Sequence, residues 1–161
     1  MEKTKQELLD KAYELGFEYE KVYRGCSQCV IAAIQDTLDI RDDSVFKAGT
    51  GLAGGGGLTG IGVCGGYVGA VMVISQLLGR ERSNFEDPEG IRYKTFELTR
   101  KFLEDYTREL GSIICRDIQL IRFGRPTTSQ TPMITRNSKP QVPMWISVPT
   151  LWARLRSWQL N

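Results

Sequence analysis

The sequence predicts an all-α protein, a small helical bundle with a glycine-rich loop before its central helix. Apolar residues recur every three or four positions along much of the chain, which is the period of an amphipathic helix. No stretch alternates apolar and polar residues as a half-buried strand does, and no internal repeat is present. These two observations fix the fold class that we expect.

The first half of the chain supplies three expected helices. Residues 2–23 place apolar side chains on one stripe between lysines and glutamates. Residues 27–38 follow the break at "RGC" and have a denser apolar face, and "DSVFKA" at 43–48 forms a short helical piece. Glycines then dominate residues 49–62, which we interpret as a loop because glycine is unfavourable inside helices.

The second half continues with the central helix, which we expect over residues 64–78. A polar connector, "GRERSNFEDPEG", spans residues 79–90. The stripe of apolar residues at 89–110 predicts a long amphipathic helix that ends at Gly111, because glycine commonly follows the last turn. Cys115 then lies near the start of another helix. We therefore expect residues 1–125 to form one helical domain.

An uncharged run includes the central helix. No charged residue occurs between Ala48 and Gly79, and the apolar part from Ile61 to Leu78 is long enough to span a bilayer. Its many glycines and the lack of a flanking aromatic belt favour a buried core helix instead. The N-terminus is charged and has no signal-peptide core, so we expect a cytoplasmic protein without a membrane partner.

The amino-acid composition limits which catalytic and metal-binding groups the chain can offer. Charged residues make up 25% and hydrophobic residues 41% of the 161 residues, as in ordinary globular proteins. The chain has no histidine, which removes the commonest general base and the commonest nitrogen ligand for metals. The carboxylates in the connectors at Asp42 and Asp43 and at Glu86 and Asp87 are expected to be solvated or to cap helices. The sequence thus shows no group of residues that could act together as catalytic acid and base.

The four cysteines are the remaining candidates for metal binding or redox chemistry. In "CSQC", Cys26 and Cys29 lie one helical turn apart at an expected helix N-terminus, where the helix dipole favours thiolate. Val30 rather than histidine follows, so this is not a haem-attachment motif. The pair fits metal ligation, thiol–disulfide exchange, or two small apolar residues on a buried face.

Cys64 heads the central helix, directly after the glycine-rich loop. We expect Gly62, Gly65 and Gly66 to allow close approach and to supply backbone N–H donors to sulfur. "GTGLAG" at 49–54 is formally G-x-G-x-x-G, but no strand precedes it and the P-loop lysine is absent. A nucleotide site is therefore not expected.

Cys115 makes a third thiol at a helix start or boundary, after Cys26 and Cys64. Three separate segments would thereby bring soft sulfur donors to one site on a helical scaffold.

These segments resemble the C_GCAxxG_C_C family of redox-active proteins, named for its spaced cysteines. "CGGYVG" at 64–69 matches the family's CGAxxG motif, with Gly66 where alanine is usual. "GCSQCVIAAI" at 25–34 and "GSIICRDI" at 111–118 look like its first and third cysteine segments. The resemblance covers about residues 5–125. Similar domains accompany the haem region of split-Soret cytochromes, where an iron–sulfur centre has been proposed. The resemblance implies electron transfer or cluster binding by cysteine.

The tail at residues 126–161 departs from this family. Family members usually carry a last cysteine in a segment like "DKCP" within an acidic helical tail, whereas this chain has no cysteine after Cys115. From Ile118 onward the chain has no acidic residue but has all three tryptophans and five of the six prolines.

A frameshift would explain both features of the tail. Codons that are compatible with residues 126–161, read from the third base of the first codon, can give an acidic, tryptophan-free string that contains "DKCP". Met144-Trp145-Ile146 can yield only "VD" in that frame. We interpret the chain from about Arg125 as frameshifted, so its basic charge indicates no nucleic-acid partner and it should pack poorly.

Three functions remain open from the sequence. In the first, Cys26, Cys64 and Cys115 bind an iron–sulfur cluster for electron transfer with an unknown redox partner protein, and Cys29 is an extra ligand or resolving thiol. In the second, Cys26 attacks and Cys29 resolves in metal-free thiol–disulfide exchange. In the third, the cysteines hold structural zinc or are buried in an interaction module. An oligomer of identical chains is compatible with all three.

Overall fold

The computed structural model describes residues 4–125, whereas residues 1–3 and the predicted tail at 126–161 lie outside the described part. The described residues contain no strand, which confirms the all-α fold. Their helices are α1 (Lys5–Val22), α2 (Cys26–Leu38), α3 (Asp43–Ala48), α4 (Gly65–Leu78), α5 (Ile91–Leu110) and α6 (Cys115–Phe123), with short 3-10 turns η1 (Thr50–Leu52) and η2 (Arg82–Asn84).

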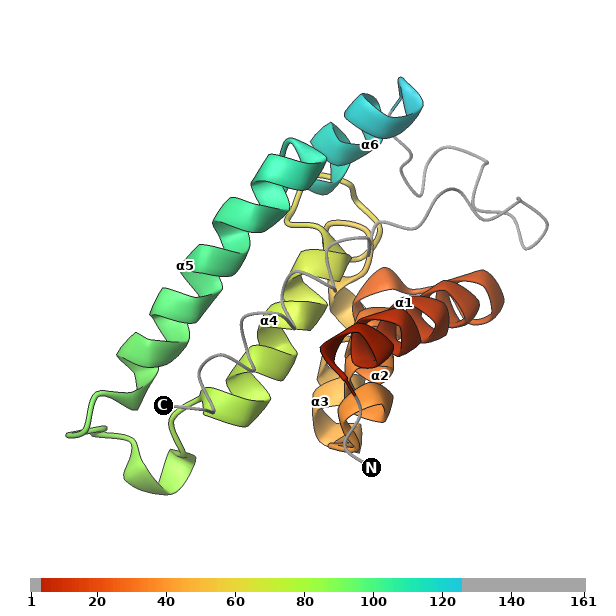
Figure 1. Cartoon of the computed structure of the whole chain (residues 1–161). Coiled ribbons are helices and arrows are strands. Elements are labelled where there is room, and N and C mark those ends of the chain that lie inside the picture. The colour runs from red at the N-terminus through yellow and green to blue at the C-terminus, as the bar shows by residue number, and fades with distance from the viewer. Residues whose placement is uncertain (1–3, 126–161) are drawn as a thin grey trace.

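Helix α4 is the centre of the bundle. It packs between α2 and α5, and α1 covers another side of α2 (Figure 1). The glycine-rich loop and α6 lie together near the N-terminal end of α4. The fully buried side chains come mainly from these packed faces: Val30, Ile31, Ile34, Val73, Ile74, Leu98, Tyr106 and Ile118.

The uncharged run divides into a loop and a helix of 14 residues, α4. Among the described residues, no helix combines the length and apolar character needed to cross a membrane. The apolar surface of α4 is instead covered by other helices, since Ala70, Val73 and Ile74 belong to the shared core.

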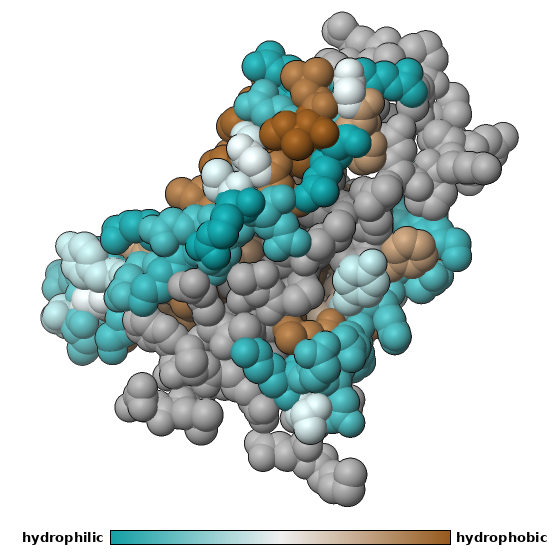
Figure 2. Space-filling model, turned by 45° about the horizontal axis from the view of Figure 1, so that its top comes forward, coloured by the Kyte–Doolittle hydropathy of each residue, from teal (hydrophilic) through white to brown (hydrophobic). Residues whose placement is uncertain are grey.

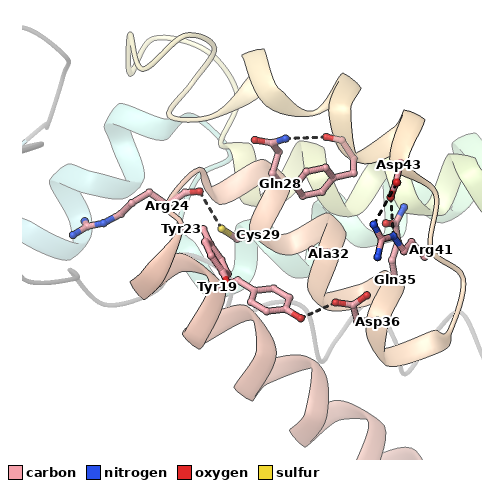
Figure 3. A pocket seen from close by; sticks show the side chains of 11 residues that line it. Tyr19, Tyr23, Arg24, Gln28, Cys29, Ala32, Gln35, Asp36, Arg41 and Asp43 are labelled. Atoms are coloured by element: carbon pink, nitrogen blue, oxygen red, sulfur yellow. Dashed lines mark hydrogen bonds and ion pairs between the residues drawn. The ribbon is translucent and has the colours of Figure 1, made fainter. Parts of the chain in front are cut away.

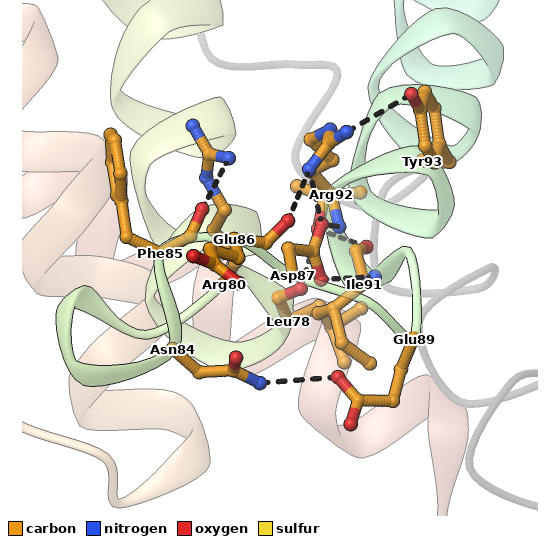
Figure 4. A network of polar contacts seen from close by, with 11 residues as sticks. Leu78, Arg80, Asn84, Phe85, Glu86, Asp87, Glu89, Ile91, Arg92 and Tyr93 are labelled. Carbon is orange, nitrogen blue, oxygen red and sulfur yellow. Dashed lines mark hydrogen bonds and ion pairs between the residues drawn. The ribbon is translucent and has the colours of Figure 1, made fainter.

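Two of the four connector carboxylates, Asp42 and Asp87, cap helices, which is one of the two roles that the sequence predicts for them. Asp42 accepts hydrogen bonds from the backbone N–H groups of Ser44 and Val45 at the start of α3. Asp87 accepts from the backbone of Ile91 and Arg92 at 2.7 and 3.0 Å (Figure 4). These bonds satisfy N–H groups that have no partner within the helix.

The start of α5 differs from the prediction of residue 89. The helix begins at Ile91 because Gly90, its N-cap, has a left-handed φ of 69°. The preceding connector is held to the helix by the Arg92 side chain, which lies 3.2 Å from the Asp87 carboxylate.

The surface is polar over much of the face shown in Figure 2, with apolar side chains near the α6 end. Leu120 and Ile121 on α6 and Ile61 in the glycine-rich loop are exposed. The backbone N–H of Arg116 donates to the carbonyl of Gly60 at 2.8 Å, which holds the loop against α6.

A glycine sets how closely α2 and α4 approach. A Cβ atom built on Gly69 would lie 2.4 Å from the backbone oxygen of Ser27 in α2. Real Cβ atoms essentially never come so near to backbone oxygen, so only glycine fits without a shift of one helix. This contact brings the N-terminal ends of α2 and α4 together, and both ends carry a cysteine.

We expect Gly69→Ala to lower the free energy of unfolding by about 1–3 kcal/mol, because the added methyl group forces the two helices apart. Gly51→Ala is the control, since a Cβ at that position would have no atom within 4 Å. Urea unfolding of both variants checks this. Equal stability of the two would contradict the close approach.

Candidate cysteine site

Three cysteines stand at three helix starts. Cys26 is the first residue of α2, Cys64 is the N-cap of α4, and Cys115 is the first residue of α6. All three are buried. Because the N-terminal end of a helix carries partial positive charge, each of these positions favours a negatively charged group.

Backbone pairing joins the segments of Cys64 and Cys115. An isolated antiparallel bridge pairs Val63 with Ile114. The backbone N–H of Cys64 donates to the Ile113 carbonyl at 2.7 Å, and the N–H of Cys115 donates to the Gly62 carbonyl at 3.0 Å. The two cysteines are therefore fixed beside each other although they are far apart in the sequence.

Glycines place the loop and α4 against the cysteine side chains. A Cβ atom at Gly65 would lie 2.5 Å from the Sγ of Cys26. A Cβ atom at Gly55, whose φ is +80°, would lie 3.1 Å from the Cβ of Cys115. Gly65 thus contributes space for a sulfur atom, and a larger residue would displace it.

Neutral groups donate hydrogen bonds to the three sulfurs. The backbone N–H of Gly54 donates to Cys26 at 3.4 Å, and the side-chain amide of Gln119 donates to Cys115 at 3.3 Å. The Tyr106 hydroxyl donates to Cys64 at 3.1 Å. The sequence singles out Tyr106 only as part of a buried stripe, and Gln119 carries no sequence signal.

The predicted backbone donors behave differently from one another. The backbone N–H of Gly66 bonds to the Cys64 sulfur, as does that of Tyr67. The N–H of Gly62 instead donates to the Gly55 carbonyl at 3.0 Å, and only its carbonyl serves the site, by accepting from Cys115.

Burial keeps the three thiols protonated. Burial, together with a smaller contribution from the neighbouring Cys64, raises the pKa of Cys26 and of Cys115 to about 12. The pKa of Cys64 is also raised by burial, while the bonds from Tyr106 and the backbone act in the opposite direction. Three thiolates here would repel one another, so forming them requires a positive charge.

Cys29 lies apart from this site, although it is buried and only one turn from Cys26. Its thiol donates to the Arg24 carbonyl at 3.3 Å and is hydrogen-bonded to the Glu20 carboxylate of α1. Glu20 is a partly buried acid whose Oε2 atom is fully buried. The sequence does not reveal it, because it lies among the charged residues of an amphipathic helix.

The donor chemistry of Cys26, Cys64 and Cys115 suits a soft metal, since sulfur is the only ligating atom type and Gly65 leaves room beside it. Yet residues 4–125 contain no group of three or more His, Cys, Asp or Glu side chains already placed to hold an ion. Binding would require the sulfurs to turn away from their present hydrogen-bond partners.

The chain was compared with known protein families, and it matches one of them. Residues 25–142 match the sequence model of the family described as "Putative redox-active protein (C_GCAxxG_C_C)", well over half of the chain. No curated protein and no solved structure matches the chain.

The stability of the reduced, metal-free protein should fall as pH rises from 9 toward about 12. The unfolded thiols lose protons near pH 9, whereas the folded ones keep them, so the unfolded state gains relative stability. Each fully buried thiol contributes at most about 1.4 kcal/mol per pH unit. Urea unfolding across this range should show a shallower fall for Cys26→Ser than for the unsubstituted protein, and equal slopes would contradict the assignment.

Proposed function

This chain belongs to the family of redox-active proteins named C_GCAxxG_C_C, and we propose that its redox centre is an iron–sulfur cluster held by Cys26, Cys64 and Cys115. Zinc is the alternative metal. In this proposal the protein works in the cytoplasm and exchanges electrons with a partner protein.

The observation that carries the proposal is the convergence of three thiols at three helix N-termini. Cys64 raises the pKa of both Cys26 and Cys115, and Cys115 also raises the pKa of Cys26. The donors Gly54, Tyr106 and Gln119 are neutral, so they stabilise a thiolate only by hydrogen bonding. A bound metal supplies the missing positive charge and replaces the thiol protons.

The surrounding residues would perform three tasks for such a centre. Burial by the core excludes water, which strengthens electrostatic effects on the reduction potential. The Tyr106 hydroxyl and the Gly66 N–H bond to Cys64, and hydrogen bonds to ligating sulfur tune that potential. The cluster itself would supply one-electron transfer.

The raised pKa values favour metal binding over thiol exchange at this centre. Reactive cysteines are partly exposed and have lowered pKa values, because the thiolate is the nucleophile. Cys26 and Cys115 have the opposite properties. A metal can still bind them, since the metal competes directly with the proton.

Metal analysis of protein purified without oxygen tests the proposal. We expect iron, acid-labile sulfide and a visible absorption band, all of which are lost in Cys26→Ser, Cys64→Ser and Cys115→Ser. Cys29→Ser is the matched control and should keep them, since Cys29 is instead hydrogen-bonded to the Arg24 carbonyl and to Glu20 of α1. Zinc without colour would replace the cluster by a structural metal. Metal-free protein in the presence of supplied iron and sulfide would overturn the proposal.

The tail supplies a second test. Iron–sulfur clusters usually take four cysteine ligands, and the resemblance implies a last cysteine that this chain lacks. We propose that residues from about Arg125 are frameshifted, a segment that falls almost entirely outside the described residues. Sequencing the gene should reveal an open alternative frame with a cysteine codon. Stop codons in that frame, or no cysteine codon, would contradict the frameshift.

A further inference from the structure

A cavity of about 530 Å³ opens over α2 between α1 and α3 (Figure 3). This volume is typical of sites for small molecules. Ala32, on the face of α2 that lines the cavity, has a small side chain that leaves this space open. The chemistry of the larger residues around it indicates which ligand the cavity fits.

Three aromatic residues line the cavity from two helices. Tyr19 lies on α1 and Tyr23 is the residue that ends this helix, whereas Phe46 lies on α3. The centroids of the two tyrosine rings are 6.0 Å apart, and their planes are tilted by 51°. A ligand in the cavity therefore lies between aromatic side chains of α1 and α3.

The faces of these three rings are open to a cation from outside the chain. The face of an aromatic ring carries partial negative charge and attracts cations. In residues 4–125, the cation–π contacts of lysine and arginine lie elsewhere, on Phe17, Phe85 and Tyr93. None of the chain's own cations in that range therefore occupies the aromatic faces at the cavity.

The cavity also has a carboxylate that no basic side chain neutralises. Asp43 is held by Arg41 through hydrogen bonds of 2.8 and 3.3 Å. Asp36 of α2 accepts a hydrogen bond from the Tyr19 hydroxyl at 2.6 Å, and it forms no ion pair with the described lysines and arginines. The side chain of Arg24 points away from the cavity (Figure 3). The Asp36 carboxylate thus gives this space a negative charge.

We propose that the cavity binds a small methylated ammonium compound, whose positive charge lies between the Asp36 carboxylate and the rings of Tyr19, Tyr23 and Phe46. Aromatic side chains around a cation are the usual means by which proteins recognise quaternary ammonium groups. The cavity is lined by none of the three cysteines of the proposed cluster. Binding therefore needs no metal and is independent of the redox centre.

The hydrogen bonds around Asp36 favour a methylated ammonium over a primary one. The Tyr19 hydroxyl already occupies the Oδ2 atom of the carboxylate, and the Nζ atom of Lys11 donates to the backbone carbonyl of Asp36 at 2.6 Å. A primary ammonium brings three N–H donors that all need acceptors. A quaternary ammonium has no N–H group, so it needs only the negative charge and contact with aromatic carbon.

The charge of the ligand gives the sharpest test. Choline and 3,3-dimethylbutanol have the same shape, but carbon replaces the positive nitrogen in the alcohol. Both fill the cavity equally well, whereas only choline is attracted to a carboxylate and to the faces of aromatic rings.

The experiment titrates the full chain with each ligand and follows the backbone amide signals by nuclear magnetic resonance. Choline should shift signals of α2 and of the end of α1, and the neutral alcohol should bind about fivefold more weakly or less. Ethanolamine, a primary ammonium of similar length, should also bind more weakly than choline. Equal binding of choline and the alcohol, tighter binding of ethanolamine, or no binding of choline would overturn the proposal.

Two pairs of variants locate the site. Asp36→Asn should weaken choline binding by about fivefold or more, whereas Asp39→Asn should not, because Asp39 is an exposed acid that follows the same helix without lining the cavity. Phe46→Leu should weaken binding by about threefold. Phe96→Leu, at an exposed aromatic residue of α5, should leave it unchanged. Unchanged affinity in both Asp36→Asn and Phe46→Leu would overturn the proposal.

Far-ultraviolet circular dichroism verifies the folding of each variant. If Asp36→Asn does not fold, the comparison of choline with 3,3-dimethylbutanol still decides the role of charge, because it uses the unsubstituted chain. A choline headgroup could also come from a lipid, so the chain is mixed with phosphatidylcholine vesicles. Sedimentation with the vesicles without binding of free choline would overturn the assignment to a small molecule.

Discussion

The close contact between α2 and the glycine face of α4 is the constraint on which the rest of the structure depends. Gly69 meets the backbone of Ser27, and Gly65 meets the sulfur of Cys26, at distances that leave no room for a side chain. Because backbones approach this closely, the start of each helix lies beside the other. The cysteines at these starts become neighbours for a reason of packing, and α6 then adds its own through the bridge at Val63 and Ile114.

Two opposing electrostatic effects meet at this site. The helix N-termini and the donors to sulfur favour thiolates, whereas burial disfavours any charge. Burial prevails for the metal-free thiols, whose pKa values are raised. The same balance would reverse with a metal cation, since its charge lies within bonding distance. The site is thus suited to hold something positive rather than to present a reactive thiol.

The pair in "CSQC" divides between two environments because residues three apart on a helix are displaced by about 60° around its axis. Cys26 contacts the glycine-rich loop, where Gly54 donates to it, and Cys29 contacts Glu20 of α1 and the Arg24 carbonyl after it. One short motif therefore serves both the buried centre and the contact between α2 and the end of α1. Any chemistry that joins the two cysteines would connect these regions.

The sequence by itself determined the helices, their caps at Asp42 and Asp87, and the position of three cysteines at helix starts. These features depend on local periodicity and on neighbours within one turn. Only the tertiary structure decided that Gly62 bonds to Gly55 rather than to sulfur, that Tyr106 donates to Cys64, and that Glu20 lies against Cys29. Each of these contacts except the first joins different helices. All three depend on the relative placement of segments, which local residue patterns do not encode.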